Sequence, residues 1–453
     1  MTKDKIKVIE KAVLAPFIML VSCFVLWGLL NNMTDNLVPA FGKIFMMSAV
    51  DSSFVQIAFY GAYAVLAIPA AIIIKKFSYR VGVLLGLGLY MIGALGYIPS
   101  AIIQSYDMFL VSIFVLACGL SVLETTCNPY VLSLGAKETS IQRLNFAQAF
   151  NPLGSLTGIF LAKYLILANL NPATYDERLA MEPDALNAIQ NNELIWVCVP
   201  YVGLVLIALI IWLFFYNFRR PENKAEEGDL NIAASFKKLI TMPRYYRGVV
   251  AQFFYVGLQI TVWTWTVKYA MTVFGFAEAE AAQYYLYSII LFIACRWIST
   301  AVMTALRDKI NPAVMLSLFA VAGILACLGT IYLPSNISIW FLVAVSGCMS
   351  LMFPTIYGIA LYGMGDEVKL GAAGLIMAIL GGAVITPIMG MFIDNGWLNT
   401  LLPSTFSVAE ASIRSSFYIA IICFAVVLAY GMYIKCSNKK LLVSGKKIYN
   451  KYI

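Results

Sequence analysis

Long apolar segments recur along the whole chain and alternate with short polar connections. Each segment holds about 20 mostly apolar residues, the length of helix that crosses ~30 Å of hydrocarbon. The pattern predicts about twelve transmembrane helices in an all-α integral membrane protein. We expect these helices at residues 12–41, 53–74, 81–103, 108–134, 145–168, 193–216, 248–272, 281–304, 312–332, 338–363, 371–394 and 413–435.

One extended polar stretch, at 217–247, separates the sixth segment from the seventh. We therefore expect an N-terminal six-helix half at 1–216, a cytoplasmic linker at 217–247, and a C-terminal six-helix half with a cytoplasmic tail at 248–453. The halves resemble each other weakly, because the fifth and eleventh segments both carry glycine and proline, in NPLGSLTG and LGGAVITPIMG. Such paired interruptions are typical of transporters built from repeats around a central site, although chance similarity between apolar segments is an alternative.

Composition and charge agree with a membrane protein. Of the 453 residues, 61% are hydrophobic and 12% are charged, and a soluble domain has about twice that charged share. The net charge of +8 comes from Lys and Arg gathered in alternate connections and at both termini, whereas the other connections hold only Lys43, Arg178 and Arg414. The positive-inside rule then predicts that both termini are cytoplasmic. The charge indicates topology and attraction to membrane lipid, so we expect no nucleic-acid partner.

Several kinds of chemistry are excluded by what the sequence lacks. There is no histidine, and the nine cysteines form no CxxC pair, so we expect no metal site. The nucleotide-binding pattern GxxxxGK[ST] and the hydrolase patterns GxSxG and HExxH are also absent. We therefore expect no cofactor and no enzymatic activity.

Polar residues inside the apolar segments are the candidates for function. Trp27, Asn31 and Asp35 lie at i, i+4 and i+8, so a helix through them places all three along one stripe. A carboxylate inside a membrane helix costs roughly 2.5–3.5 kcal/mol on insertion scales. A proton is the simplest cargo for such a group. If the helix ends near Asn31, Asp35 is instead an acid of the interfacial loop.

A second carboxyl group lies in LETTCNPY, where Glu124 and Asn128 are one helical turn apart. Pro129 removes a backbone donor from the same turn. Because an apolar environment disfavours the charged form of a carboxyl group, Glu124 is a candidate for proton uptake near neutral pH. The alternative is a structural carboxyl group that is permanently hydrogen-bonded to a neighbouring helix.

Two amides, Gln148 and Asn151, lie at i, i+3 in LNFAQAFNPLGS and are expected on one side of a helix. Amides bind hydroxyl groups without holding charge, which suits a ligand that must be released. Amide contacts between membrane helices are the alternative.

The seventh segment carries a polar and aromatic stripe, and the eighth carries a deeply placed cation. The stripe suits a sugar, because aromatic rings stack on its C–H face and amides bind its hydroxyl groups; ordinary aromatic packing is the alternative. The cation, Arg296, is expected to pair with a carboxylate or with helix carbonyls, in a gating or a structural role. The stripe consists of Gln252, Tyr255, Gln259 and Trp263.

Several of these segments resemble the fucose–galactose–glucose:proton symporter family of the major facilitator superfamily. The resemblance is carried by LWGLLNNMTDNLVPAF, LETTCNPY, RLNFAQAFNPLG, AQFFYVGLQITVW, FPTIYG and GGAVITPIMG, and it extends over nearly the whole chain. It implies proton translocation by Asp35 and Glu124. Phe353 stands where the resemblance leads us to expect a tyrosine, which leaves the identity of the sugar open. Together, the residue patterns and the resemblance predict a substrate site formed by Trp27, Asn31, Asn128, Gln148, Asn151, Gln259, Trp263 and Phe353.

The resulting hypothesis is a monomeric, proton-coupled sugar symporter in the inner membrane of a bacterium. By the resemblance, L-fucose is the first candidate substrate, with galactose, glucose and N-acetylhexosamines as alternatives. Alternating access would proceed by rocking of the two halves around a midplane site. Sodium coupling, proton/drug antiport and a sugar sensor without transport are the competing hypotheses.

Overall fold

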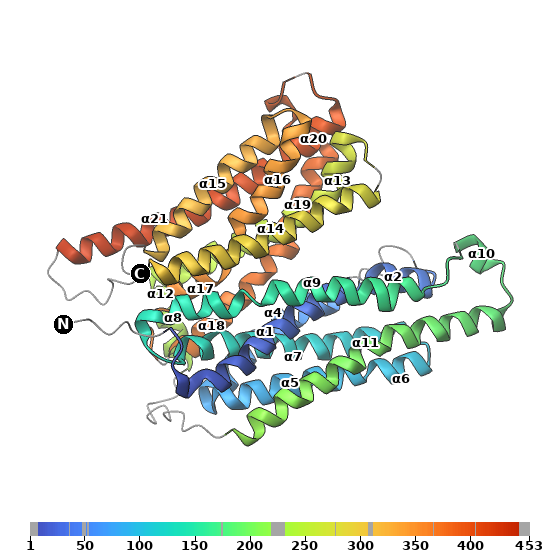
Figure 1. The fold of residues 1–453 in the computed structure, drawn as a ribbon, viewed down its shortest axis with the longest axis horizontal. Helices are drawn as coiled ribbons and strands as arrows, with labels where there is room; N and C mark the ends of the chain where they lie inside the picture. The colour runs from blue at the N-terminus through green and yellow to red at the C-terminus, as the bar shows by residue number, and fades with distance from the viewer. Residues whose placement is uncertain are drawn as a thin grey trace. The chain divides into compact units, whose positions relative to one another are not determined.

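The computed structural model is built from helices (Figure 1). It describes residues 8–35, 37–47, 51, 54–173, 175–218, 232–276, 278–306, 311–365, 367–403 and 405–443, and no strand occurs among them. Eleven helical segments of this part are long and apolar enough to cross a membrane. They match eleven of the predicted segments. The seventh predicted segment is the 32-residue helix α13 (Pro243–Phe274). The predicted all-α membrane fold is confirmed.

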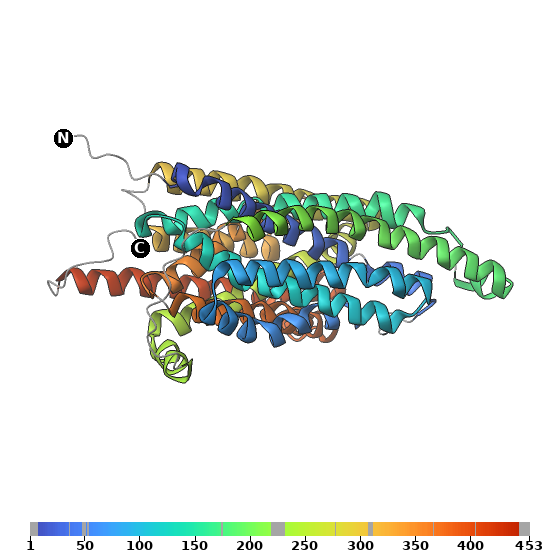
Figure 2. The ribbon, with the colours of Figure 1, turned by 90° about the horizontal axis from the view of Figure 1, so that it is seen from below.

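The chain divides into two compact units. The N-terminal unit consists of Lys11–Val131 and Phe150–Ile232, and the C-terminal unit of Met1–Glu10, Leu132–Ala149 and Ala233–Ile453. The helices of the N-terminal unit are α1 (Leu14–Asp35), α2 (Leu37–Ile44), α4 (Phe54–Lys76), α5 (Tyr79–Leu95), α6 (Tyr97–Ile102), most of α7 (Tyr106–Ser133), α9 (Asn151–Leu161), α10 (Tyr175–Leu179) and α11 (Pro183–Asn217). Those of the C-terminal unit, besides α13, are α8 (Ser140–Gln148), α12 (Ile232–Thr241), α14 (Glu278–Ala305), α15 (Pro312–Tyr332), α16 (Ser335–Met349), α17 (Met352–Leu361), α18 (Glu367–Met377), α19 (Gly381–Asn395), α20 (Val408–Ser416) and α21 (Tyr418–Val443). Within each unit the long helices run alongside one another (Figures 1 and 2).

Several predicted segments are interrupted helices rather than continuous ones. The fifth segment turns at residues 149–150, between α8 and α9, and the tenth is interrupted between α16 and α17. Ala149 and Phe150 nevertheless keep right-handed helical dihedral angles, so the shared face predicted for Gln148 and Asn151 stays a prediction. The hydrogen bonding is interrupted at Pro152, which has no N–H to offer the carbonyl four residues earlier, that of Gln148.

Glycines allow equivalent helices to approach closely in both units. A Cβ atom on Gly154 of α9 would lie 2.0 Å from the carbonyl oxygen of Val25 in α1. A Cβ atom on Gly381 of α19 would lie 2.0 Å from the carbonyl oxygen of Phe253 in α13. The first and fifth predicted segments thus pack as the seventh and eleventh do, through small residues that bring backbones together. This correspondence supports the predicted repeat.

Two of the three basic residues expected in the outer connections are buried in ion pairs. Arg178 and Glu193 are each 1% exposed, and their closest N–O distance is 2.5 Å. Arg414 of α20 is 0% exposed and pairs with Glu410 at 2.9 Å. Each guanidinium is therefore neutralised by its own buried or partly buried carboxylate.

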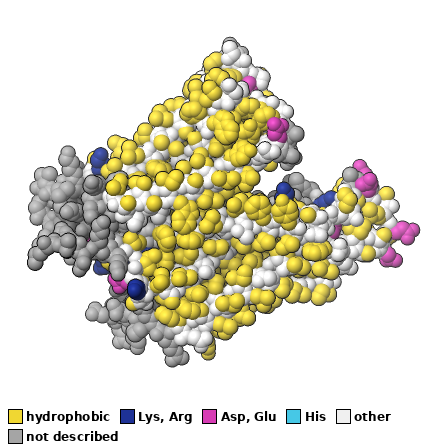
Figure 3. All heavy atoms as spheres, in the orientation of Figure 1, with side chains coloured by type: hydrophobic (Ala, Val, Ile, Leu, Met, Phe, Trp, Pro, Cys, Tyr) yellow, Lys and Arg dark blue, Asp and Glu magenta, His cyan; other side chains and the backbone are white. Residues whose placement is uncertain are grey.

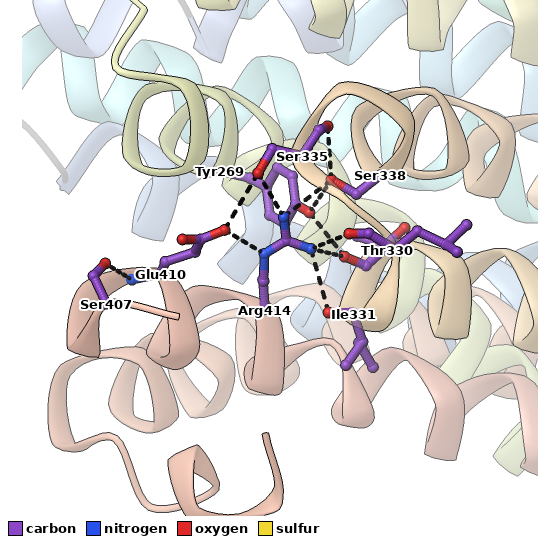
Figure 4. Close-up of polar contacts among 9 residues, drawn as sticks. Tyr269, Thr330, Ile331, Ser335, Ser338, Ser407, Glu410 and Arg414 are labelled. Carbon is purple, nitrogen blue, oxygen red and sulfur yellow. Dashed lines mark hydrogen bonds and ion pairs between the residues drawn. The ribbon is translucent and has the colours of Figure 1, made fainter. Parts of the chain in front are cut away.

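The Arg414 guanidinium also completes the end of a neighbouring helix (Figure 4). Its Nη1 donates to the carbonyl oxygens of Thr330, Ile331 and Leu333, at 3.0, 3.3 and 3.0 Å, where α15 ends. The last carbonyls of a helix have no partner within the helix, and in lipid they need another donor. Arg414 therefore stabilises the junction between α15, α16 and α20.

The surface of the helices is largely apolar (Figure 3). Large hydrophobic side chains with exposed fractions above half include those of Ile57, Ile92, Val111, Leu206 and Leu318. Charged side chains lie mainly near helix ends in this view. Such a surface fits contact with lipid along the helices and with water at their ends.

Gly154→Ala should destabilise the protein by about 1–3 kcal/mol, because the added methyl group has no space against the backbone of α1. Gly88→Ala in α5 is the matched control, since no atom beyond its own helical backbone and chain neighbours lies within 4 Å of the position that its Cβ atom would take. Thermal unfolding of the two purified variants in detergent measures the difference. Equal unfolding temperatures would contradict the close approach of α1 and α9.

Candidate functional site

The N-terminal unit contains a hydrogen-bonded aromatic pair and a buried acid. Trp27 of α1 donates through Nε1 to the hydroxyl oxygen of Tyr63 in α4, at 2.6 Å. Glu124 of α7 is 4% exposed, and neither carboxyl oxygen has a hydrogen-bond partner among the described residues. The alternative of a carboxyl group permanently hydrogen-bonded to a neighbouring helix is therefore not what the structure shows.

Asn128 lies on the same face of α7 as Glu124, as predicted. Its Nδ2 donates to the backbone carbonyl of Glu124 at 3.0 Å. The helix continues through Pro129 without a break, so the Asn128 amide is held within one turn of the acid.

The remaining candidates of the N-terminal unit lie on α1 and α9. Asn31 is half-buried one turn beyond Trp27 on α1. Asp35 is the last residue of α1, so the helix extends past Asn31, but its side chain lies outside the described residues. The Asn151 side chain donates to the carbonyl of Phe24 at 3.1 Å. This contact joins α9 to α1, in agreement with the helix-contact alternative for that amide.

The C-terminal unit contains the predicted stripe on α13. The Tyr255 hydroxyl donates to Oε1 of Gln259 at 2.7 Å, and its ring lies edge-on to that of Phe353, with centroids 6.3 Å apart. Trp263 donates through Nε1 to the hydroxyl of Ser346 at 3.2 Å. The amide and the rings are thus held in fixed orientations, and Gln259 and Trp263 are only partly buried.

Arg296 of α14 is 3% exposed and binds helix carbonyls, which is one of the two predicted kinds of partner. Its Nε donates to the carbonyl of Ser350 at 2.5 Å, and its Nη1 donates to the carbonyl of Gln148 at 3.2 Å. The guanidinium also lies over the ring of Phe292, 4.5 Å from its centroid. Within the described part of the chain no carboxylate forms an ion pair with it.

The two carbonyls that Arg296 binds have the same origin. Pro152 follows Gln148 by four residues, and Pro354 follows Ser350 by four residues. A proline supplies no N–H to the carbonyl four residues before it, so both carbonyls lose their helical donor. One guanidinium with several donors in a fixed plane replaces both missing hydrogen bonds.

Sequence reasoning missed some residues of this arrangement. Tyr63 lies in an apolar segment without a local pattern, and only the fold brings it to Trp27. Ser346 was missed for the same reason. The sequence does contain a sign of the role of Arg296, because each proline shows that the carbonyl four residues earlier needs another donor. It does not show which side chain reaches that carbonyl.

Comparison with known proteins identifies the family. The model of the major facilitator superfamily matches residues 17–387. The chain belongs to the major facilitator superfamily. It is 41% identical to the L-fucose–proton symporter of Haemophilus influenzae over 94% of this chain and 97% of that protein. It is 30% identical to the glucose/galactose transporter of Brucella abortus over 90% and 91% of the two chains.

A solved structure gives the same result. The Escherichia coli fucose:proton symporter in its outward conformation matches with a TM-score of 0.82 at 31% identity, over 93% of this chain and 99% of that chain. This superfamily member is accordingly a multi-pass membrane transporter rather than an enzyme.

Arg296→Leu should destabilise the protein by about 2–4 kcal/mol, because it leaves two buried carbonyls without donors. The matched background is Pro152→Ala with Pro354→Ala, which returns a backbone N–H to each carbonyl. In that double variant, Arg296→Leu should lower the free energy of unfolding by less than it does in the wild type, as measured by thermal unfolding in detergent. An equal loss of stability in both backgrounds would show that Arg296 does not replace the missing hydrogen bonds.

Proposed function

We propose that this transporter is a proton-coupled symporter that imports a hexose, with L-fucose as the first candidate. The observation that carries the proposal is Glu124, a fully buried carboxyl group without a hydrogen-bond partner in the described structure. A buried ionisable group in a membrane protein is a functional group by default, and proton uptake removes the cost of its charge. The names of the relatives support fucose first and glucose or galactose second.

Sugar recognition fits both sets of side chains. The rings of Trp27 and Trp263 offer apolar faces for the C–H groups of a pyranose, and the amides of Asn31 and Gln259 offer donors and acceptors for its hydroxyl groups. All four side chains are only partly buried. We assign supporting roles to Asn128, Gln148, Asn151 and Phe353, whose side chains are less than 9% exposed.

Transport would proceed by alternating access, in which the two six-helix halves rock around a midplane site. Protonation of Asp35 and Glu124 on the outer side would favour closing around the sugar, and release of the proton to the cytoplasm would favour release of the sugar. The coupling free energy is the difference in sugar affinity between the protonated and deprotonated protein.

In this proposal the protein is a monomer in the inner membrane of a bacterium, and both termini face the cytoplasm. The placement of basic residues supports this orientation.

Glu124→Gln and Asp35→Asn should each abolish accumulation of sugar driven by a proton gradient, because a neutral amide cannot cycle a proton. Exchange of internal for external sugar should persist, since it needs no net proton movement. Radiolabelled uptake and counterflow in proteoliposomes measure the two activities. Asp107→Asn is the matched control, an exposed carboxylate on the same helix as Glu124. Accumulation against a gradient by both variants would contradict the assignment of the carboxyl groups.

L-Fucose should make the external medium alkaline when it is added to de-energised cells expressing the protein in weak buffer, because each sugar would enter with a proton. D-Galactose, D-glucose and N-acetylglucosamine, added in turn, test the alternative substrates by the same pH trace. A flat trace with every sugar from cells that contain the protein would contradict proton symport and favour sodium coupling or a sensor.

A further inference from the structure

One exposed guanidinium of the C-terminal unit is held by aromatic rings instead of by acceptors. Arg247, in the second turn of α13, has its Cζ atom 4.0 Å from the centroid of the Tyr433 ring in α21. The same atom lies 5.8 Å from the centroid of the Tyr246 ring. Within the described part of the chain, no hydrogen bond or ion pair involves this guanidinium. The rings attract the cation and restrict its orientation, while its five N–H donors stay available for a ligand.

The neighbouring Arg244 differs from Arg247 in this respect. It lies three residues earlier on α13 and donates through Nη2 to the carbonyl of Tyr362. Its own backbone carbonyl accepts a hydrogen bond of 3.2 Å from the Tyr430 hydroxyl of α21. Arg244 therefore holds helices together, whereas the stacked Arg247 is free to bind something else.

This end of the C-terminal unit attracts anions. Lys237 of α12 and Lys435 of α21 are exposed, and Figure 1 shows α12 and the last turns of α21 at the same end of the unit. Lys238 pairs with Glu367 at 3.6 Å, which leaves the other two lysines to attract a ligand. A guanidinium is planar and matches the geometry of phosphate, which it binds through two parallel hydrogen bonds.

An apolar surface adjoins the cation. Val250, three residues after Arg247 on α13, is 47% exposed, and Ala429, four residues before Tyr433 on α21, is also exposed. Both lie about one helical turn further into the apolar part of their helices. Tyrosine is typical of the level at which lipid headgroups lie. A ligand with an anionic head and an acyl chain fits the cation and the apolar surface, whereas a soluble phosphate fits only the cation.

We propose that Arg247, held against Tyr433 and Tyr246, binds the phosphate of an anionic phospholipid whose acyl chain lies along Val250 and Ala429. This inference goes beyond sugar transport and depends neither on the sugar nor on the coupling ion. The proposed orientation of the protein places the site in the cytoplasmic leaflet, which is rich in negatively charged lipid.

The chain offers matched variants for both parts of the site. Arg247→Gln removes the cation. Lys237→Gln is its control, because it removes the same charge from the same end of the unit, at a side chain without a ring contact in the described structure. Tyr433→Leu removes the ring under the guanidinium, and Tyr433→Phe keeps it. All four variants are purified, freed of lipid and checked for an unchanged size-exclusion profile.

Native mass spectrometry of each protein in detergent, titrated with phosphatidylglycerol, measures the dissociation constant of the lipid. Arg247→Gln should raise this constant about tenfold, the effect of losing a hydrogen bond to a charged group. Tyr433→Leu should raise it about threefold, because the guanidinium loses the ring that orients it. Tyr433→Phe and Lys237→Gln should match the wild type. Phosphatidylcholine with the same acyl chains should bind the wild type more weakly, because it has no net charge.

Three results would overturn the inference. Equal weakening by Lys237→Gln and Arg247→Gln would show that the lipid responds to general charge and that Arg247 forms no site. Equal affinities of Tyr433→Leu and the wild type would show that the ring does not position the guanidinium. Displacement of phosphatidylglycerol by an equal concentration of glycerol 3-phosphate, the headgroup phosphate without acyl chains, would assign the site to a soluble phosphate. Because no step of the experiment involves transport, failure of the proposed symport would leave these results unchanged.

Discussion

Backbone carbonyls released by proline are the constraint on which much of this structure depends. Lipid offers no donor to a carbonyl that has lost its helical N–H, so every interrupted helix needs a donor from elsewhere in the protein. Arg296 supplies donors to the carbonyls of Gln148 and Ser350, each four residues before a proline. Arg414 supplies donors to carbonyls at the end of α15, which have lost their helical partners because the helix stops there. Buried arginine thus satisfies carbonyls that would otherwise have no donor in lipid.

Against this background the state of Glu124 is distinctive. The buried guanidinium groups of Arg178, Arg296 and Arg414 all have partners, whereas both oxygens of Glu124 have none among the described residues. The paired arginines fix the geometry of the helices. Glu124 tolerates the lack of hydrogen-bond partners when it is protonated but not when it is ionised, and proton coupling requires such a difference between the two protonation states.

The sequence predicted the fold class and the positions of the helices well, because apolar length and charge placement are local properties. It also predicted the burial of Glu124 and the common stripe of Tyr255 and Gln259, which are set by helical spacing. It did not show where the hydrogen bonds of the fifth helix are interrupted, which is between α8 and α9, where the Gln148 carbonyl lacks the N–H that Pro152 cannot supply. The hydrogen bond between Trp27 and Tyr63 could not be predicted, because the two residues are 36 positions apart and only the packing of α1 against α4 brings them together. The predicted division into two halves and the assignment of sugar-binding residues stay predictions.

The most direct test of the account is net proton uptake by the purified protein in detergent, followed with a pH indicator in weak buffer as L-fucose is added. The account predicts that sugar binding draws protons from solution at a pH where Glu124 is partly ionised, and that the Glu124→Gln variant binds sugar with a smaller uptake or none. Equal proton uptake by the two proteins, with equal sugar affinity, would contradict the central claim that Glu124 carries the coupled proton.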